Sequence, residues 1–211
     1  MTTSSSAVER LIADPTGRQP RADARRNVER LVAAARTAIA EIGVDASAHE
    51  IAARAGVGIG TFYRRIPSRE ALLLAVLLEV LDSMAEAGDQ ALTATDPWQG
   101  LADFALAYVG LRAESCGLCE ALGGARAEEL AETLAELRER FRLLVERAQA
   151  AGVMRADIAW QDVPFLLASI TTGERTLGLQ AGGEQWQRTL RILLDGLRTS
   201  TPGPLPGVAP N

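Results

Sequence analysis

Few side chains in this sequence have the types and spacing that catalysis or metal binding requires. His49 is the only histidine, and Cys116 and Cys119 are the only cysteines. A Cys-x-x-Cys pair does redox chemistry after the strand of a βαβ unit and binds zinc when a second pair completes four ligands; neither context is present. We therefore expect no catalytic residue, no metal and no cofactor. The two cysteines are either small buried helix residues or a redox-sensing pair.

A second group of polar residues gathers between positions 47 and 69. Arginine, serine, threonine and tyrosine side chains donate hydrogen bonds to phosphate, and arginine also pairs with guanine O6 and N7. The group contains Ser47, Thr61, Tyr63, Arg64, Arg65 and Arg69.

The charge of the chain is unevenly distributed. The formal net charge is −5, yet residues 1 to 70 carry 11 arginines against 8 acidic residues, and the remainder carries 11 against 19. Counterion release on DNA depends on the local contacts, so a basic N-terminal part is compatible with phosphate binding.

Short helices are predicted to position the polar group. A helix over 24–42 ends at Gly43, and Ser47 with Glu50 forms a capping box that starts the next helix. That helix breaks at 55–57, and a second short helix follows over 58–65. Two short helices joined by a tight turn indicate a helix-turn-helix, whose second helix lies in the major groove.

The rest of the chain also predicts helices, over 97–113, 116–122, 125–151, 160–180 and 184–198, after a long helix that Ser68 caps. We predict an all-α fold of about nine helices with no strand. Four parts are expected, namely a disordered extension (1–20), a helix-turn-helix domain (21–70), a regulatory domain (71–200) and a Pro/Gly-rich tail (201–211). The longest apolar run has eight residues and the first twenty are polar, so we expect a cytoplasmic protein without a membrane partner.

The sequence IAARAGVGIGTFYRRIPSREALLLAV, at 51–76, resembles the tetracycline-repressor (TetR) family, and the resemblance extends over roughly 24–80. It is weaker beyond, with AGVMRAD at 151–157 and DGL at 195–197. The resemblance implies a homodimeric transcriptional repressor that binds a palindromic double-stranded DNA operator and is released by a small-molecule effector. Two half-sites would then lie about 34 to 36 Å apart or at a multiple of this.

The resemblance also assigns DNA-binding roles to individual positions. Tyr63 and Arg69 match residues that hold the DNA backbone, and Arg64 and Arg65 stand where side chains meet phosphates or base edges. The full set is Ser47, His49, Ile59, Gly60, Thr61, Tyr63, Arg64, Arg65 and Arg69. For Ser47 a purely capping role, and for His49 a merely exposed helix position, remain open. Gly58 replaces a common capping residue.

The regulatory domain has candidate residues for two further roles. An effector pocket, with a neutral or apolar ligand, would be lined by Trp98, Phe104, Tyr108, Phe141, Phe165 and Ser169, although aromatics at this spacing are also typical of a core. No charge occurs over 163–173, which predicts burial on both sides and thus a dimer interface or the centre of a monomer. The interface candidates are Ile170, Gly173, Leu177, Trp186, Leu190, Leu193, Leu194 and Leu197.

An enzyme is disfavoured, since no nucleophile stands beside a base in any motif. A dimeric helical adaptor, or a regulator that responds to oxidation of Cys116 and Cys119, is the alternative.

Overall fold

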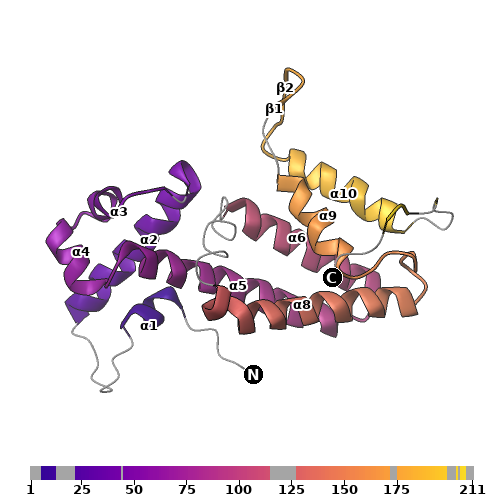
Figure 1. Ribbon diagram of the computed structural model, residues 1–211, viewed down its shortest axis with the longest axis horizontal. Helices are drawn as coiled ribbons and strands as arrows, with labels where there is room; N and C mark the ends of the chain where they lie inside the picture. Colours follow the sequence, from indigo (N-terminus) through magenta and orange to yellow (C-terminus); the bar gives the residue numbers. More distant parts are fainter. Residues whose placement is uncertain are drawn as a thin grey trace. The chain divides into compact units, whose positions relative to one another are not determined.

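A computed structural model describes residues 6–12, 22–43, 45–114, 127–171, 175–198, 203 and 205–207. In these ranges the chain forms nine α-helices, one 3-10 helix and one two-stranded sheet (Figure 1). The chain divides into two compact units, residues 1–83 with 114–133 and residues 84–113 with 134–211. The predicted all-α class is confirmed.

The first unit is built on α1 (Ala7–Ile12), α2 (Ala22–Ile42), α3 (Ala48–Arg54), α4 (Ile59–Arg65) and the start of α5 (Arg69–Thr93). Its core combines one apolar stripe of α2 with the inner faces of α3, α4 and α5. Fully buried members include Leu31, Ile39, Ile51, Phe62, Ile66, Leu72 and Leu73.

The predicted disorder of residues 1–20 is wrong at α1. Ser6 and Glu9 form a reciprocal capping arrangement, in which the Glu9 N–H donates to Ser6 Oγ at 3.3 Å and the Ser6 N–H donates to the Glu9 carboxylate at 3.0 Å. Ala7 is fully buried. A helix of six residues is marginal in water, so this one forms because it packs on other helices.

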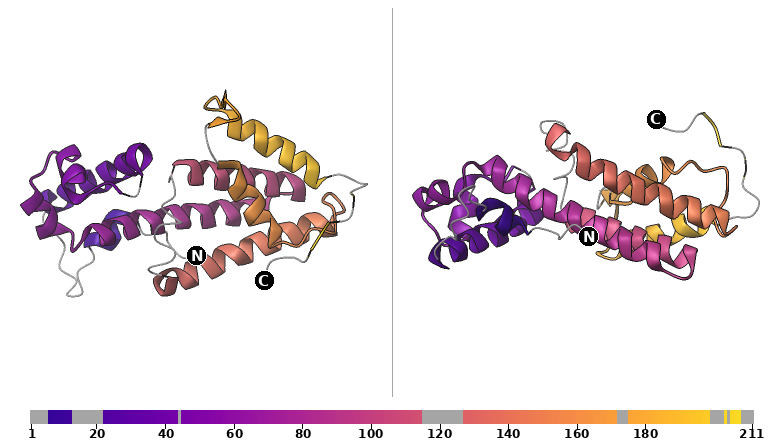
Figure 2. Two further views of the ribbon diagram at one scale, coloured as in Figure 1. Left: turned by 45° about the horizontal axis from the view of Figure 1, so that its top comes forward. Right: turned by 90° about the horizontal axis from the view of Figure 1, so that it is seen from below.

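The second unit contains the rest of α5, α6 (Pro97–Glu114), most of α8 (Ala127–Ala150), α9 (Asp162–Ala168), the 3-10 helix η1 (Ser169–Thr171), β1 (Arg175–Thr176), β2 (Leu179–Gln180) and α10 (Gln185–Leu197). Helices α5, α6 and α8 run roughly alongside one another, and α9 crosses them at a steep angle (Figure 2). Arg140 of α8 pairs with Asp89 of α5 through two hydrogen bonds, at 2.8 and 2.9 Å.

The prediction of one helix over 160–180 is wrong after Thr171. The segment over 175–180 instead forms an antiparallel hairpin in which Arg175 pairs with Gln180 and Thr176 with Leu179. Its two turn residues, Leu177 and Gly178, have φ values of +47° and +79°. Positive φ at both positions matches the twist of a tight hairpin and is incompatible with a right-handed helix.

The domain boundary also differs from the predicted one. The first unit ends at Ser83, inside α5, whereas the sequence places the change where this helix begins. Leu72, Leu73, Val76 and Leu77 of α5 are all buried, which explains why its first turns belong to the first unit. No described helix is long and apolar enough to cross a membrane.

Candidate nucleic-acid interface

The start of α3 is fixed by a complete capping box. Ser47 is the N-cap, its Oγ accepts a hydrogen bond from the Glu50 N–H at 3.2 Å, and its own N–H donates to the Glu50 carboxylate at 2.7 Å. The hydroxyl and the N–H of Ser47 hold the pKa of Glu50 below its ordinary value, because both donate to the charged carboxylate. The structural role of Ser47 is therefore confirmed, and a DNA contact by Ser47 stays a prediction.

A tight turn joins α3 to α4. Gly56 has a φ of +64°, a region that glycine enters without steric cost, and the Val57 N–H donates to the Ala52 carbonyl at 3.0 Å. Gly58 is the N-cap of α4 and provides no side-chain hydrogen bond, as its lack of a side chain predicts. The chain therefore changes direction between α3 and α4.

Two neighbouring aromatic residues of α4 differ sharply in exposure. Phe62 is fully buried, whereas Tyr63 is 55% exposed and contacts the Phe62 ring edge to face, with centroids 5.1 Å apart. The burial of Phe62 anchors α4 on the core of the first unit. This packing presents the Tyr63 hydroxyl on the outer side.

Arg69, the first residue of α5, reaches back to the loop before α3. Its Nε donates to the Ala46 carbonyl at 2.6 Å, and its guanidinium lies 3.4 Å from the Glu70 carboxylate. The backbone N–H at the start of α5 and the neighbouring Arg69 hold the pKa of Glu70 below its ordinary value. The side chain of Arg69 is thereby held beside the N-terminus of α3.

Four predicted DNA-binding residues come together in one cleft. Ser47, His49, Tyr63 and Arg69 belong to three different helices or their caps, and all line this cleft. The described residues that line it are Asp45, Ser47, Ala48, His49, Tyr63, Ser68, Arg69 and Glu70. The sequence interpretation did not include Asp45 or Glu70 among the DNA-binding residues.

The other predicted contacts lie along α4. Gly60 and Arg64 are exposed, whereas Ile59, Thr61 and Arg65 are partly buried. Arg64 donates to Thr61 Oγ1 at 3.3 Å. No heavy atom lies within 4 Å of the position that a Cβ would occupy at Gly60, so a DNA backbone would have room to approach α4 closely there. The exposed face of α4 consequently adjoins the cleft through Tyr63.

This arrangement defines the class of the protein. Two short helices meet at a glycine turn, the second exposes one face, and hydroxyl and guanidinium groups flank it. That is a helix-turn-helix, a motif whose second helix lies in the major groove of DNA.

Comparison with known proteins assigns the family. Residues 31–76 match the family described as bacterial regulatory proteins, tetR family, and residues 96–199 match the C-terminal domain of SbtR-like transcriptional regulators. No curated protein matches the chain.

Solved structures agree. A TetR transcription regulatory protein from Mycobacterium vanbaalenii is 31% identical, with 85% of this chain and 99% of that chain covered and a TM-score of 0.58. A TetR transcriptional regulator from Streptomyces coelicolor is 27% identical over 82% of this chain and 99% of its own, also with a TM-score of 0.58. A TetR family regulator from Thermus thermophilus has a similar fold, with 20% identity, coverage of 80% and 97% and a TM-score of 0.64.

The chain therefore belongs to the TetR family of DNA-binding transcriptional regulators. Members of this family regulate transcription and are not enzymes, and they act as dimers. Among the described residues, no three His, Cys, Asp or Glu side chains are grouped to hold a metal.

The predicted effector residues separate into three places in the second unit. Phe104, Tyr108 and Phe141 are buried and pack on one another, with the Phe104 and Phe141 centroids 4.8 Å apart. Phe165 and Ser169 instead line an external groove of about 690 Å³ with Asp157, Ile158, Ala159, Asp162, Leu166, Leu205, Pro206 and Gly207. Trp98 lies apart from both, with the Arg198 guanidinium 4.9 Å above its ring. The periodicity of the sequence identified these aromatic residues, but it did not show which of them lie in the core and which line the groove.

The predicted interface residues are also divided. Leu190, Leu194 and Leu197 of α10 are buried in the second unit, as is Ile170, so the structure corrects their assignment to a partner-facing surface. They are the inner stripe of an amphipathic helix. The exposed candidate is Leu177, at 97%, while Trp186 and Leu193 are partly buried. Gly173, Cys116 and Cys119 lie outside the described residues.

Proposed function

We propose that this chain is a homodimeric repressor that binds a palindromic operator through α4 and leaves it when a small molecule binds the second unit. The observation that carries the DNA-binding part of the proposal is the cleft beside α4. Arg69, Tyr63, Ser47 and His49 surround one space, and arginine, tyrosine and serine donate to phosphate oxygens. An anchored backbone would then present the bases to Arg64 and Arg65 of α4.

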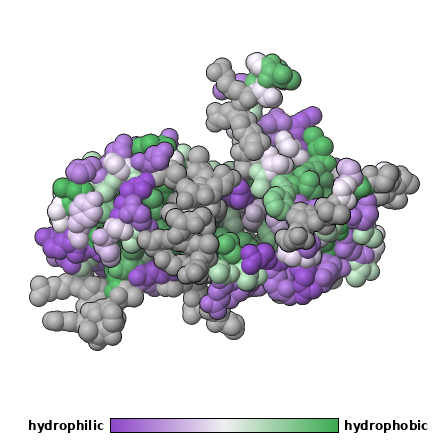
Figure 3. Space-filling model, viewed as in Figure 1, coloured by the Kyte–Doolittle hydropathy of each residue, from purple (hydrophilic) through white to green (hydrophobic). Residues whose placement is uncertain are grey.

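Exposed apolar residues of the second unit support the dimer. Leu177 and Leu179 of the hairpin and Ile192 of α10 are 97%, 69% and 64% exposed. The hairpin tip is the green patch at the top of Figure 3. Gly196, one turn after Ile192, has open space around it, so another helix can approach α10 closely here. We propose that a second copy covers this surface, which we call the hairpin–α10 surface.

The groove beside α9 supports an effector site. Its volume is within the range of small-molecule sites, roughly 300 to 1,000 Å³. Phe165 and Leu166 supply apolar contact and the Ser169 hydroxyl supplies a polar one, which fits the predicted apolar or neutral ligand. The carboxylates of Asp157 and Asp162 add acceptors for a ligand that carries a donor group.

Two measurements test this function together. Deletion of the gene should raise transcription of the genes next to it, because a repressor is removed. A compound that raises the melting temperature of the protein should release it from DNA of that region in a gel shift. A fall in transcription on deletion would show an activator, and a stabilising compound that never releases DNA would remove the effector part.

The redox alternative is tested in the same assay. Mild peroxide would have to crosslink Cys116 to Cys119 and weaken DNA binding. If binding is unchanged by peroxide, the small-molecule mechanism stands without a competing signal.

A further inference from the structure

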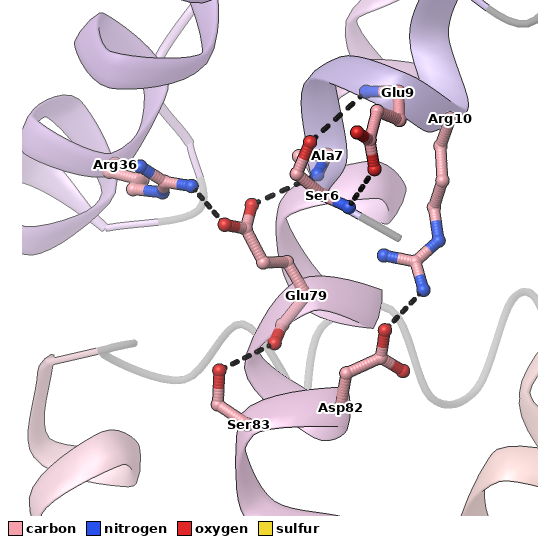
Figure 4. Close-up of polar contacts among 8 residues, drawn as sticks. All are labelled: Ser6, Ala7, Glu9, Arg10, Arg36, Glu79, Asp82 and Ser83. Atoms are coloured by element: carbon pink, nitrogen blue, oxygen red, sulfur yellow. Dashed lines mark hydrogen bonds and ion pairs between the residues drawn. The ribbon is translucent and has the colours of Figure 1, made fainter. Parts of the chain in front are cut away.

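Two acidic residues on one turn of α5 hold the N-terminal helix and α2 in place. Figure 4 shows Glu79 and Asp82 on α5, facing Ala7 and Arg10 of α1, with Arg36 of α2 on the other side of Glu79. The sequence interpretation assigned no role to these residues. None of them lies in the cleft or on α4.

Glu79 joins three helices. One carboxylate oxygen accepts the backbone N–H of Ala7 at 3.1 Å, and the other accepts the Arg36 guanidinium at 2.5 Å. Only a quarter of the Glu79 side chain is exposed, whereas half of Arg36 is. Ala7 and Arg36 come from different helices, so one carboxylate fixes both against α5.

Asp82 adds a second connection one turn further along. It forms an ion pair with Arg10 at 2.5 Å, and these two side chains are 20% and 23% exposed. An ion pair with this little solvent contact is screened less than a surface pair. Glu79 and Asp82 therefore connect α1 to α5 at two points.

We infer that Glu79 and Asp82, with α1, form a positioning site for DNA recognition, which we call the α1 clamp. α2 packs against α3 and α4, so a fixed α2 fixes the recognition helix relative to α5. The clamp occupies the last turns of α5 in the first unit, immediately before this helix continues into the second. In a dimer, the range of distances between the two copies of α4 depends on how rigidly each copy is attached to α5.

The inference rests on the proposed dimeric operator binding, and it predicts a specific defect. A loosened clamp allows each α4 to adopt a range of positions, so half-sites at neighbouring spacings are accepted. Affinity for the preferred spacing should fall about three- to tenfold, as expected for loss of partly exposed ion pairs. Affinity for spacings one base pair shorter or longer should change little.

The test is selection of operators from a pool of random double-stranded DNA with the full-length protein. The wild type should enrich paired half-sites of one spacing. Glu79→Ala and Asp82→Ala should enrich a broader distribution, and Glu79→Gln provides a same-size variant should Glu79→Ala fail to fold. Glu86→Gln is the matched control, since Glu86 is an exposed glutamate of the same helix and should retain the narrow distribution.

Two outcomes would overturn the clamp. Variants that bind every spacing more weakly by the same factor would show that it contributes only stability, as would variants with an unchanged distribution. If the wild type enriches no paired sites, the proposed dimeric function itself fails, and the positioning role falls with it. Exchange of the two charges in Arg10→Asp with Asp82→Arg keeps the ion pair. This double variant should therefore select a narrower distribution of half-site spacings than Asp82→Ala does.

Discussion

The capping box at α3 allows the structural and DNA-binding roles of Ser47 to be separated. In Ser47→Ala the Glu50 N–H loses its acceptor, and the Ser47 hydroxyl also stops donating to the Glu50 carboxylate at 2.7 Å. Loss of such a cap costs about 1 kcal/mol, which is roughly a fivefold change in an equilibrium constant. We expect the amide hydrogen of Glu50 to exchange about five times faster.

Hydrogen exchange followed residue by residue measures this directly, because the Glu50 N–H is itself the capped group. Ser47→Asn is the control, since asparagine caps helices as well as serine does. It should retain protection of the Glu50 amide. A loss of DNA affinity in Ser47→Asn with protection retained would assign the hydroxyl a contact of its own. Unchanged exchange in Ser47→Ala would refute the capping argument.

Burial, charge and exposure give three further predictions. Phe62→Ala should lower the free energy of unfolding by about 3 to 5 kcal/mol, because the ring is fully buried. Tyr63→Phe should leave urea unfolding unchanged within about 0.5 kcal/mol and weaken DNA binding, and equal stability losses would contradict the difference in burial of the two rings. The lowered pKa values of Glu50, Glu70 and Asp157 mean that these carboxylates stabilise the fold at neutral pH, and that this stabilisation is lost as the pH falls from the ordinary carboxylate range through the lowered values. The melting temperature should therefore fall between pH 7 and pH 3, and by less in Glu50→Gln, whereas a melting temperature that rises on acidification would contradict the argument. Ile192→Glu should shift sedimentation from dimer to monomer, since a charge would be buried at the hairpin–α10 surface. Gln187→Glu, at an exposed position on another face of α10, should leave the dimer intact. A dimeric Ile192→Glu protein would place the interface elsewhere.

The helix-turn-helix was predictable because its signals are local. The signals are Gly43, the pair Ser47 and Glu50, and the break at 55–57. Each acts within a few residues, so helix ends could be placed without knowledge of the packing. The alternation of buried Phe62 and exposed Tyr63 follows from the helical period of α4.

The features that were mispredicted depend on distant contacts. α1 is held by contacts of Ala7 with Glu79 and of Arg10 with Asp82, and each pair is 72 residues apart in the sequence. The inner stripe of α10 has the same periodicity whether it meets a partner or its own chain, so sequence could not decide that Leu190 and Leu194 are core. Leu177 adopts a positive φ that residues other than glycine rarely take, so the residue types of this segment did not predict a hairpin.

The central claim is that α4 and the adjoining cleft bind DNA. Its most direct test is a titration of DNA from upstream of the gene, across a series of salt concentrations, with the wild type, Tyr63→Phe and Arg69→Ala. We predict affinity for the wild type that falls steeply with salt, weaker binding by both variants, and a shallower salt dependence for Arg69→Ala because one phosphate contact is lost. Variants that bind as tightly as the wild type at every salt concentration would contradict the assignment of the cleft.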